Sequence, residues 1–296
     1  MFYEKFSNTL ALPQEVRALM ATLQTKLGDL PELQDKLFEQ DYETPKLIEQ
    51  LKQLSEETKI HEYTLSFYLL FVSAKRLYGI YEKQQLSEDI FFNTMHDLVC
   101  KLNECKAVHG IWGTFVFRWY PPFYRMKRFG LGRLQYDITT YEWEPYTKHG
   151  VSIKPGDTVY KCHIPSNGPL TKKARTDSYK KAFEFFKCNP LVIICDAWLL
   201  YPPHKDFLPQ HLNIVDFMDD FDIISYKEEP MFSNAWRVFG ASHTADPSLW
   251  PRETSLQRAY AERVQQGLPT GTGQGILVFD GNNIITAKQH FSTVNA

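Results

Sequence analysis

The segment from residue 159 to residue 200 constrains the fold most, because it alternates strand, turn, helix and strand signals. Residues 159–164 are a β-branched and aromatic run typical of a strand. Pro, Asn and Gly residues break it over 165–169, and Thr171 stands where a helix N-cap is expected. The helical stretch over 171–187 then leads to a second apolar run, "PLVIICDAWLL". Short connections of this kind predict a right-handed crossover between two neighbouring parallel strands.

The predicted helix in this segment begins with basic residues. Helix N-termini favour acidic residues, because their exposed N–H groups carry partial positive charge. Lys172, Lys173 and Arg175 add to that charge. Together with a turn in which Gly168 allows close backbone approach, they predict a phosphate or pyrophosphate site. An ordinary Gly-Pro turn followed by solvated basic side chains is the alternative.

The bulk properties exclude several classes of protein. The 296 residues suffice for one large or two ordinary domains, and the net charge of −2 argues against a nucleic-acid or membrane-surface partner. The five cysteines form no CxxC pair, so we expect no metal site. Their odd number without a signal peptide predicts a reducing, cytoplasmic location. The longest apolar run, 63–74, is too short to span a membrane.

Residues 1–108 are predicted to form an all-helical domain. A periodic apolar pattern opens with Pro13 and closes at Gly28, and Ser87 is placed to cap a later helix. Residues 62–83 are apolar around most of the helix circumference, which predicts a central, buried helix.

Residues 109–296 are predicted to form a mixed α/β sheet domain, so the fold class is α+β. Strand-like alternation begins at 113–120, "GTFVFRWY", and continues toward the strand–helix–strand segment. The Gly-rich stretch 268–275, "LPTGTGQG", lacks the Lys-Ser/Thr ending of a P-loop and precedes a strand. We predict that it is a flexible turn or a lid.

His163 and Cys195 are predicted to lie near the C-terminal ends of the adjacent parallel strands, where open α/β sheets bind ligands. An ordinary histidine, with a pKa near ~6.5, suits a general base, and a structural role in holding the loop is the alternative. Cys195 is a candidate nucleophile or a packing residue. Asp196 should face the other way from Cys195 and would orient a base or cap a loop. Tyr201 or Tyr226 would protonate a leaving group.

Several motifs together resemble those of a known family. The stretches "HIPSNGPLT", "SYKKAFEFF", "CDAWLLYP", "LNIVDF" and "PRETSLQRA" resemble a group of bacterial proteins with a helical N-terminal domain and a C-terminal domain similar to the GNAT superfamily of acyl-CoA-dependent N-acyltransferases. The resemblance covers nearly the whole chain. It implies transfer of an acyl group, by preference acetyl, from acetyl-CoA or another acyl-CoA to an amine acceptor. The candidate catalytic residues for this reaction are His163, Cys195, Asp196 and Tyr226.

The superfamily holds the pyrophosphate of CoA in a Q/R-x-x-G-x-G/A loop. The matching stretch here retains Gly168, whereas Pro165 replaces the Gln or Arg and Leu170 replaces the last small residue. The element with Asn213 and Phe217 resembles a second superfamily feature, an Asn at a helix start followed by an aromatic residue. The residues implied in CoA binding are His163, Ile164, Pro165, Ser166, Asn167, Gly168, Leu170, Thr171, Lys172, Lys173, Trp198, Asn213 and Phe217.

Two further hypotheses remain open. The altered loop is compatible with a catalytically degenerate GNAT-like protein that binds a ligand or partner without turnover. A thiol enzyme that uses Cys195 with His163 is the third hypothesis, and it predicts covalent labelling of Cys195.

Overall fold

The computed structural model describes residues 2–287, and its contacts divide the chain into two compact units. The helical unit runs up to Leu131 and includes Pro165–Asn167. The sheet unit comprises 132–164 and the residues from Gly168 onward. The helical unit contains α1 (Phe2–Thr9), α2 (Gln14–Leu27), α3 (Pro31–Phe38), α4 (Thr44–Thr58), α5 (Glu62–Lys83), α6 (Glu88–Met95), α7 (Asp97–His109), the 3₁₀ helix η1 (Phe117–Trp119), α8 (Pro121–Tyr124) and β1 (Arg128–Leu131).

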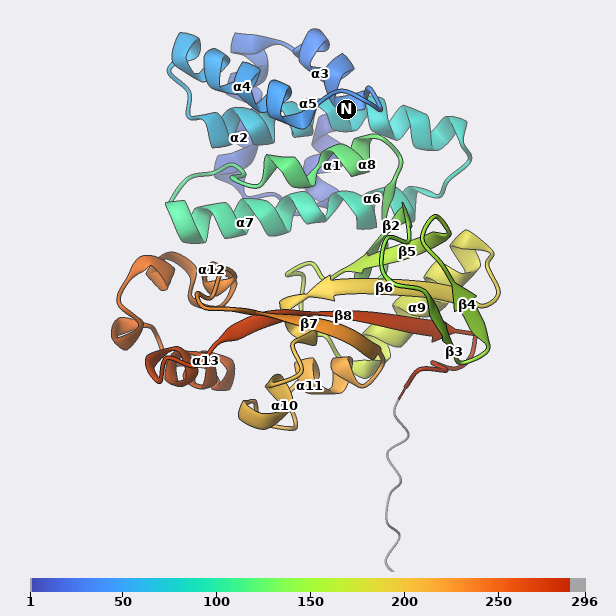
Figure 1. The fold of residues 1–296 in the computed structure, drawn as a ribbon. Helices are drawn as coiled ribbons and strands as arrows, with labels where there is room; N and C mark the ends of the chain where they lie inside the picture. The colour runs from blue at the N-terminus through green and yellow to red at the C-terminus, as the bar shows by residue number, and fades with distance from the viewer. Residues whose placement is uncertain (1, 288–296) are drawn as a thin grey trace, which may run out of the picture. The chain divides into compact units, whose positions relative to one another are not determined.

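Helix α5 is the centre of the helical unit, as its apolar circumference predicts. Every residue from Thr64 to Ala74 is buried, and α1, α2, α3, α4 and α6 all contact α5 (Figure 1). The predicted ends of two helices are also confirmed. Gly28 ends α2 with a φ of +63°, and the Ser87 hydroxyl accepts the Ile90 N–H at the start of α6.

The strand predicted over 113–120 is wrong. These residues form a loop and η1, and the Thr114 N–H donates to the Tyr63 carbonyl at 3.0 Å. A Cβ on Gly113 would lie 2.5 Å from the Tyr63 carbonyl carbon, so the loop lies directly against the start of α5. The alternating apolar residues therefore pack on helices, and the contacts divide the chain after Leu131, whereas the alternation predicts a boundary near residue 108.

The sheet unit contains a mixed sheet, which gives the predicted α+β class. Its strands run in the order β2-β5-β6-β8-β7, and β5 and β6 are the predicted parallel pair, joined by α9. The other pairs are antiparallel. The elements are β2 (Leu134–Thr140), β3 (Tyr146–Lys148), β4 (Val151–Ile153), β5 (Thr158–His163), α9 (Lys172–Phe186), β6 (Leu191–Ala197), η2 (Trp198–Leu200), α10 (His204–Phe207), α11 (Asn213–Met218), β7 (Asp222–Glu229), α12 (Ala235–Phe239), η3 (Gly240–Thr244), η4 (Pro247–Leu249), α13 (Ser255–Gln265) and β8 (Thr270–Phe279).

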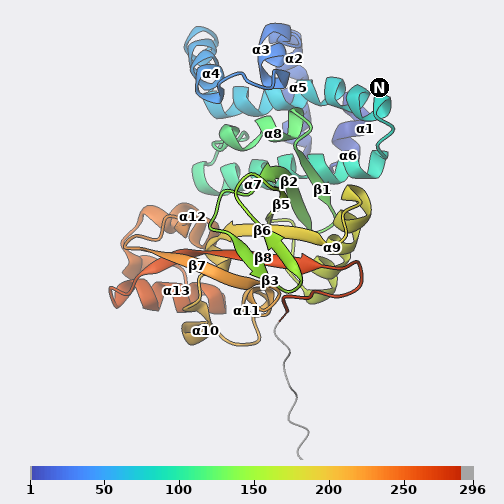
Figure 2. The ribbon, with the colours of Figure 1, turned by 45° about the vertical axis from the view of Figure 1, so that its right-hand side comes forward.

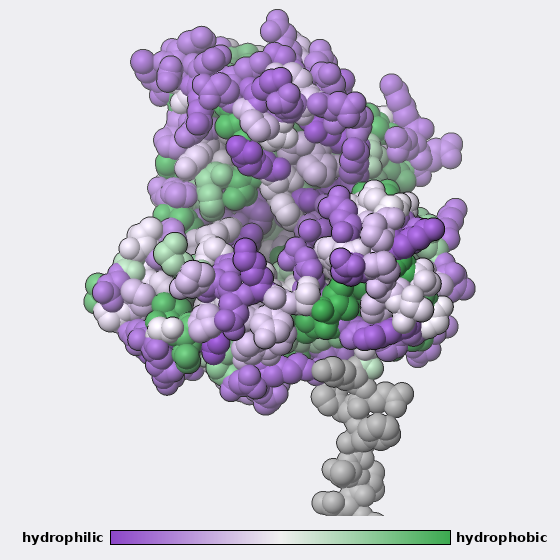
Figure 3. All heavy atoms as spheres, viewed as in Figure 1, coloured by the Kyte–Doolittle hydropathy of each residue, from purple (hydrophilic) through white to green (hydrophobic). Residues whose placement is uncertain are grey.

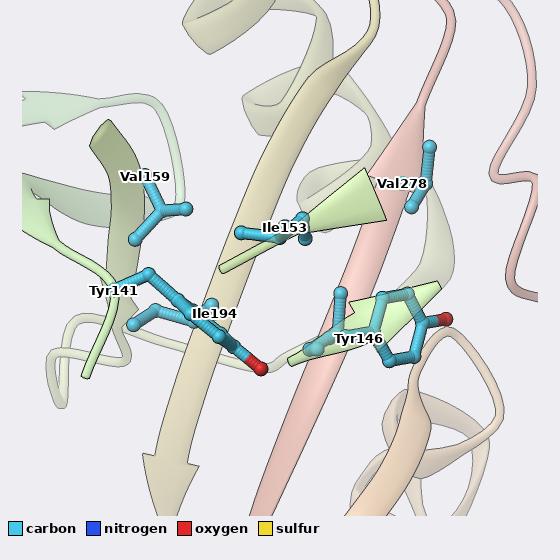
Figure 4. Packing of buried hydrophobic residues seen from close by; sticks show 7 residues of the cluster. Tyr141, Tyr146, Ile153, Val159, Ile194 and Val278 are labelled. Carbon is cyan, nitrogen blue, oxygen red and sulfur yellow. The ribbon is translucent and has the colours of Figure 1, made fainter. Parts of the chain in front are cut away.

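Different elements pack on the two faces of the sheet. Helix α9 lies on one face, where the Tyr136 hydroxyl meets the Ser178 hydroxyl at 3.0 Å. The β3–β4 hairpin lies on the other face (Figure 2). There Tyr146 and Ile153 of the hairpin pack with Ile194 and Val278 of the sheet (Figure 4). Because strand residues alternate between faces, each side chain of the sheet can be assigned to the α9 face or to the hairpin face.

The flexible turn or lid predicted over 268–275 is also wrong, because most of this stretch is the first half of β8. The glycines of this stretch lie very close to the backbone and side chains of the segment around Leu200. A Cβ on Gly273 would lie 2.1 Å from the Leu200 carbonyl oxygen, and one on Gly271 would lie 2.6 Å from the Tyr201 ring. The glycines thus allow the chain around η2 to lie directly on the strand.

Replacing Gly273 by alanine is expected to lower the free energy of unfolding by about 1–3 kcal/mol, because backbone must move to admit the methyl group. Gly79→Ala is the matched control, since Gly79 lies near the end of α5 and no heavy atom lies within 4 Å of its added Cβ. That change should be neutral or stabilising by up to about 1 kcal/mol. Denaturant unfolding of both variants checks this, and equal stabilities would contradict the close packing of β8.

No helix within residues 2–287 is long and apolar enough to cross a membrane. Hydrophilic residues cover most of the face seen in Figure 3, with apolar residues in small patches.

Candidate functional site

The loop between β5 and α9 has the backbone geometry that the sequence predicts. Gly168 has a φ of +131°, a conformation that favours glycine, and its Cα faces open space, with no heavy atom within 4 Å of an added Cβ. The Thr171 hydroxyl accepts the Ala174 N–H at 3.3 Å, so Thr171 caps α9 as predicted. Arg133 donates to the carbonyl oxygens of Gly168 at 2.7 Å and Pro169 at 3.2 Å. The loop is therefore fixed from one side and open at Gly168.

The basic residues at the start of α9 divide into two kinds. Lys172 and Lys173 are exposed, as an anion site requires, and Lys173 pairs with Asp177. Arg175, in contrast, is fully buried and forms ion pairs with Asp220 and, at 2.7 Å, with Asp216. The prediction that Arg175 attracts an anionic ligand is therefore wrong, because two carboxylates already neutralise it.

The electrostatics of this buried group follow from burial and pairing. Burial acts to lower the pKa of Arg175, but the hydrogen bonds and charge of Asp220 and the hydrogen bond of Asp216 outweigh it and raise the pKa. Burial raises the pKa of Asp220, while Arg175 and Tyr179 act in the opposite direction. Arg175 also donates to the Leu170 carbonyl at 3.3 Å, so the network holds the end of the loop.

His163, the last residue of β5, pairs with a carboxylate that the sequence analysis missed. Its Nε2 lies 2.9 Å from Oδ2 of Asp137, and both side chains are largely buried, at 15% and 17% exposed. The register of β2 and β5 explains the contact, because Gln135 is opposite His163 and Asp137 is the diagonal neighbour on the same face. An ionised carboxylate only accepts, so Nε2 of His163 donates to Asp137.

The structure separates the four predicted catalytic residues into two pairs. His163 and Asp196 lie on the hairpin face, in line with Val159 and Ile194 of its core. Cys195 and Tyr226 lie on the opposite face, since they are paired in register with Gly275 and Gly273 of β8.

Cys195 is fully buried, whereas Tyr226 is 56% exposed. Burial raises the pKa of the neighbouring Cys162 thiol well above its ordinary value, with Cys195 as a further cause. Cys195 therefore sits in a buried thiol pair on the face away from His163, which gives the thiol-enzyme hypothesis no support.

The remaining predicted cofactor residues lie in different settings. Ile164 is half-buried, and Pro165 and Leu170 are buried. Trp198 packs edge-to-face on Tyr260, and Phe217 is buried against Phe221. Asn213 is the exposed first residue of α11.

Within the described chain, no group of three or more His, Cys, Asp or Glu side chains is placed to hold a metal ion. The arrangement offers a helix N-terminus with a Gly-containing loop, which suits an anion. At the end of the same strand it offers an imidazole held by a carboxylate, which suits proton transfer.

Comparison with known proteins shows two family matches and a shared fold. Residues 129–277 match the model of the GNAT-like C-terminal domain, and residues 1–126 match the N-acyltransferase N-terminal domain. Comparison with curated protein sequences gives no match. A solved acyltransferase in complex with decanoyl-CoA and teicoplanin has a TM-score of 0.65 at 17% identity, over 94% of this chain and 99% of that one.

A second solved structure, an acyltransferase in complex with CoA and 10C-Teicoplanin, has a TM-score of 0.63 at 17% identity, over 93% of this chain and 98% of that one. At such identities the likeness shows the fold alone. The resemblance recognised in the sequence is confirmed by the family models: the chain belongs to the family of proteins with a GNAT-like C-terminal domain, preceded here by an N-acyltransferase N-terminal domain.

Proposed function

We propose that this protein is an acyl-CoA-dependent N-acyltransferase. The observation that carries the proposal is the strand–loop–helix segment 158–186, which presents an open Gly168 loop and a helix N-terminus directly after the His163–Asp137 pair. The family match supports acyl transfer, and the solved relatives of the same fold were crystallised with CoA and decanoyl-CoA.

The residues present fit a CoA phosphate. Gly168 leaves open space where a larger side chain would stand, and the N-terminus of α9 with Lys172 and Lys173 provides the positive potential. The backbone of loop residues 164–167, together with Leu170 and Thr171, would form the rest of the seat. Bound acyl-CoA would supply the activated acyl group.

His163 is the proposed general base, and Asp137 holds its ring. The imidazole accepts a proton from the acceptor amine as the new C–N bond forms and the C–S bond of the thioester breaks. The protonated ring then gives this proton to the departing thiolate, so that the products are the amide and the free thiol of CoA. Asp196 lies on the same face and would hold the cationic acceptor before it loses its proton.

Titration calorimetry with acetyl-CoA, decanoyl-CoA and free CoA tests the proposal. Binding that weakens at higher salt is expected, because phosphate contacts are electrostatic. The comparison of the acetyl and decanoyl esters also tests the acetyl preference. Absence of binding to all three at millimolar concentration would refute the proposal.

Replacing Gly168 by aspartate is expected to abolish CoA binding with the fold retained. The carboxylate would occupy the open space at Gly168 and repel a phosphate, although φ at this position also disfavours a side chain. Gly150→Asp is the matched control, because Gly150 also has a positive φ and open surroundings but lies in the β3–β4 turn. Calorimetry that finds equal CoA affinities for the two variants would rule out the loop assignment.

The degenerate binding protein remains the second candidate, because Pro165 and Leu170 replace the residues that the superfamily uses in its loop. Binding of acyl-CoA without release of free thiol, across a broad panel of amines, would favour it over the enzyme.

A further inference from the structure

Helix α7 carries a buried cluster of charged residues that the proposed function does not use. Asp97, Lys101 and Glu104 follow one another at i, i+4 and i+7, so they lie on one face of the helix. Asp97 is 2% exposed and Lys101 4%, and the side chain of Glu104 is 14% exposed. Lysine and glutamate are rarely buried unless they are paired, so this cluster requires an explanation.

The contacts of the cluster lead to the loop after β5. Lys101 Nζ lies 3.1 Å from both carboxylate oxygens of Glu104. The hydroxyl of Ser166 donates to Oε1 of Glu104 at 2.7 Å. Ser166 belongs to the short segment Pro165–Asn167, which groups with the helical unit by its contacts. The paired carboxylate of α7 thus holds a residue two positions before Gly168.

A contribution to folding stability does not account for this arrangement. The cost of taking two charges out of water often cancels the attraction between them, so a buried ion pair is a weak source of stability. A hydrogen bond from a hydroxyl to a carboxylate is, in contrast, strong and directional. The contact with Lys101 fixes the orientation of the Glu104 carboxylate, and the Ser166 hydroxyl donates to that carboxylate.

We propose that Glu104, oriented by Lys101, is a positioning residue for the CoA loop. Holding Ser166 fixes the backbone over 165–167 before a ligand arrives, so less conformational entropy is lost on binding. This inference rests on the proposed function. The sequence alone gives no signal for it, because Glu104 and Ser166 are 62 positions apart.

A double-mutant cycle on Ser166→Ala and Glu104→Gln tests the proposal, with CoA affinity measured by calorimetry. Ser166→Ala is expected to weaken CoA binding by about five- to tenfold, the effect of losing one charge-assisted hydrogen bond. Because Ser166 is exposed, its thermal unfolding midpoint should not change. Ser152→Ala is the matched control: this exposed hydroxyl also bonds a side chain, that of Thr147, and its loss should leave CoA affinity unchanged.

The coupling between the Glu104 and Ser166 substitutions shows whether Ser166 is positioned by Glu104 or contacts CoA directly. If Glu104 acts through Ser166, the double variant binds CoA about as well as the weaker single variant. Additive losses would overturn the proposal, since Ser166 would then contact the ligand itself. Unchanged affinity in Ser166→Ala would overturn it as well.

A measurement on the protein without CoA tests this inference independently of the proposed function. Hydrogen exchange of the amides of Asn167 and Gly168 should be several-fold faster in both single variants than in the wild type. If the wild type binds no CoA, the proposed function fails, and exchange alone decides whether Glu104 fixes the loop. Equal exchange in all variants would refute the positioning role.

Discussion

Replacing His163 by glutamine is expected to slow acyl transfer to an amine by about 10²- to 10⁴-fold, the usual contribution of a general base. CoA affinity should change little, because the imidazole precedes the loop and is engaged with Asp137. Glutamine keeps a polar side chain that can still meet the carboxylate but has no basic nitrogen. The loss should therefore fall on kcat, with the acidic limb of the pH–rate profile removed.

The measurement is release of free thiol from acyl-CoA with the acceptor amine found by screening. His211→Gln is the control, because His211 is an exposed histidine outside the His163–Asp137 pair and its loss should leave the rate unchanged. A His163→Gln enzyme that retains the wild-type rate would exclude His163 as the base and leave the family assignment intact.

Asp137 should behave as a positioning residue in the same assay. Asp137→Asn leaves the imidazole present but removes the charge that fixes its tautomer, and a misplaced catalytic group costs up to about 10²-fold in rate. The loss should fall on kcat and leave CoA affinity unchanged, because Asp137 acts through the imidazole and not on the CoA loop. A purely structural role would instead lower CoA affinity and the thermal unfolding midpoint together with kcat.

The sequence predicts the scaffold of the site because local signals determine it. The run 159–164, the Thr171 cap and the apolar run 191–197 each carry a strand or helix signal, and short connections leave one topology. The position of Gly168 follows for the same reason, since only a left-handed turn needs glycine there. The fold class and the position of the loop between β5 and α9 could therefore be predicted from the sequence.

The sequence could not predict the partners of the site residues, because they depend on strand register and packing. Asp137 reaches His163 through the pairing of β2 with β5, and Glu104 reaches Ser166 from another helix. In the sequence, the glycines of β8 have the pattern of a loop. The structure shows that they belong to a strand, on which the chain around Leu200 packs. Such contacts join residues that are far apart in the sequence, so no local sequence pattern predicts them.

Arg175 is the residue whose role changes most between sequence and structure, and its replacement by methionine should be strongly destabilising. The guanidinium is fully buried, and the Asp220 side chain beside it is only 3% exposed. Removing the cation leaves Asp220 as an uncompensated buried charge, which costs about 3–5 kcal/mol of unfolding free energy. Lys173→Met on the same helix is the control, because its ion pair with Asp177 is exposed and its loss should leave the free energy of unfolding nearly unchanged.

The pH dependence identifies the cause of this loss. Burial already raises the pKa of Asp220, and without Arg175 the opposing influence is weaker, so the pKa rises further. A carboxyl with a folded-state pKa above its unfolded value takes up a proton on folding, so the folded state gains stability as the pH falls. The stability gap between Arg175→Met and the wild type should therefore narrow toward low pH.

The double variant Arg175→Met/Asp220→Asn completes the argument. If the uncompensated charge of Asp220 causes the loss, removing that charge should restore part of the stability at neutral pH and abolish the narrowing of the gap. If lost packing of the long Arg175 side chain is the cause, the double variant will be no more stable than Arg175→Met at any pH. Denaturant unfolding of the wild type, Arg175→Met, Lys173→Met and the double variant between pH 4 and 8 distinguishes the charge effect from lost packing, because only the charge effect depends on pH.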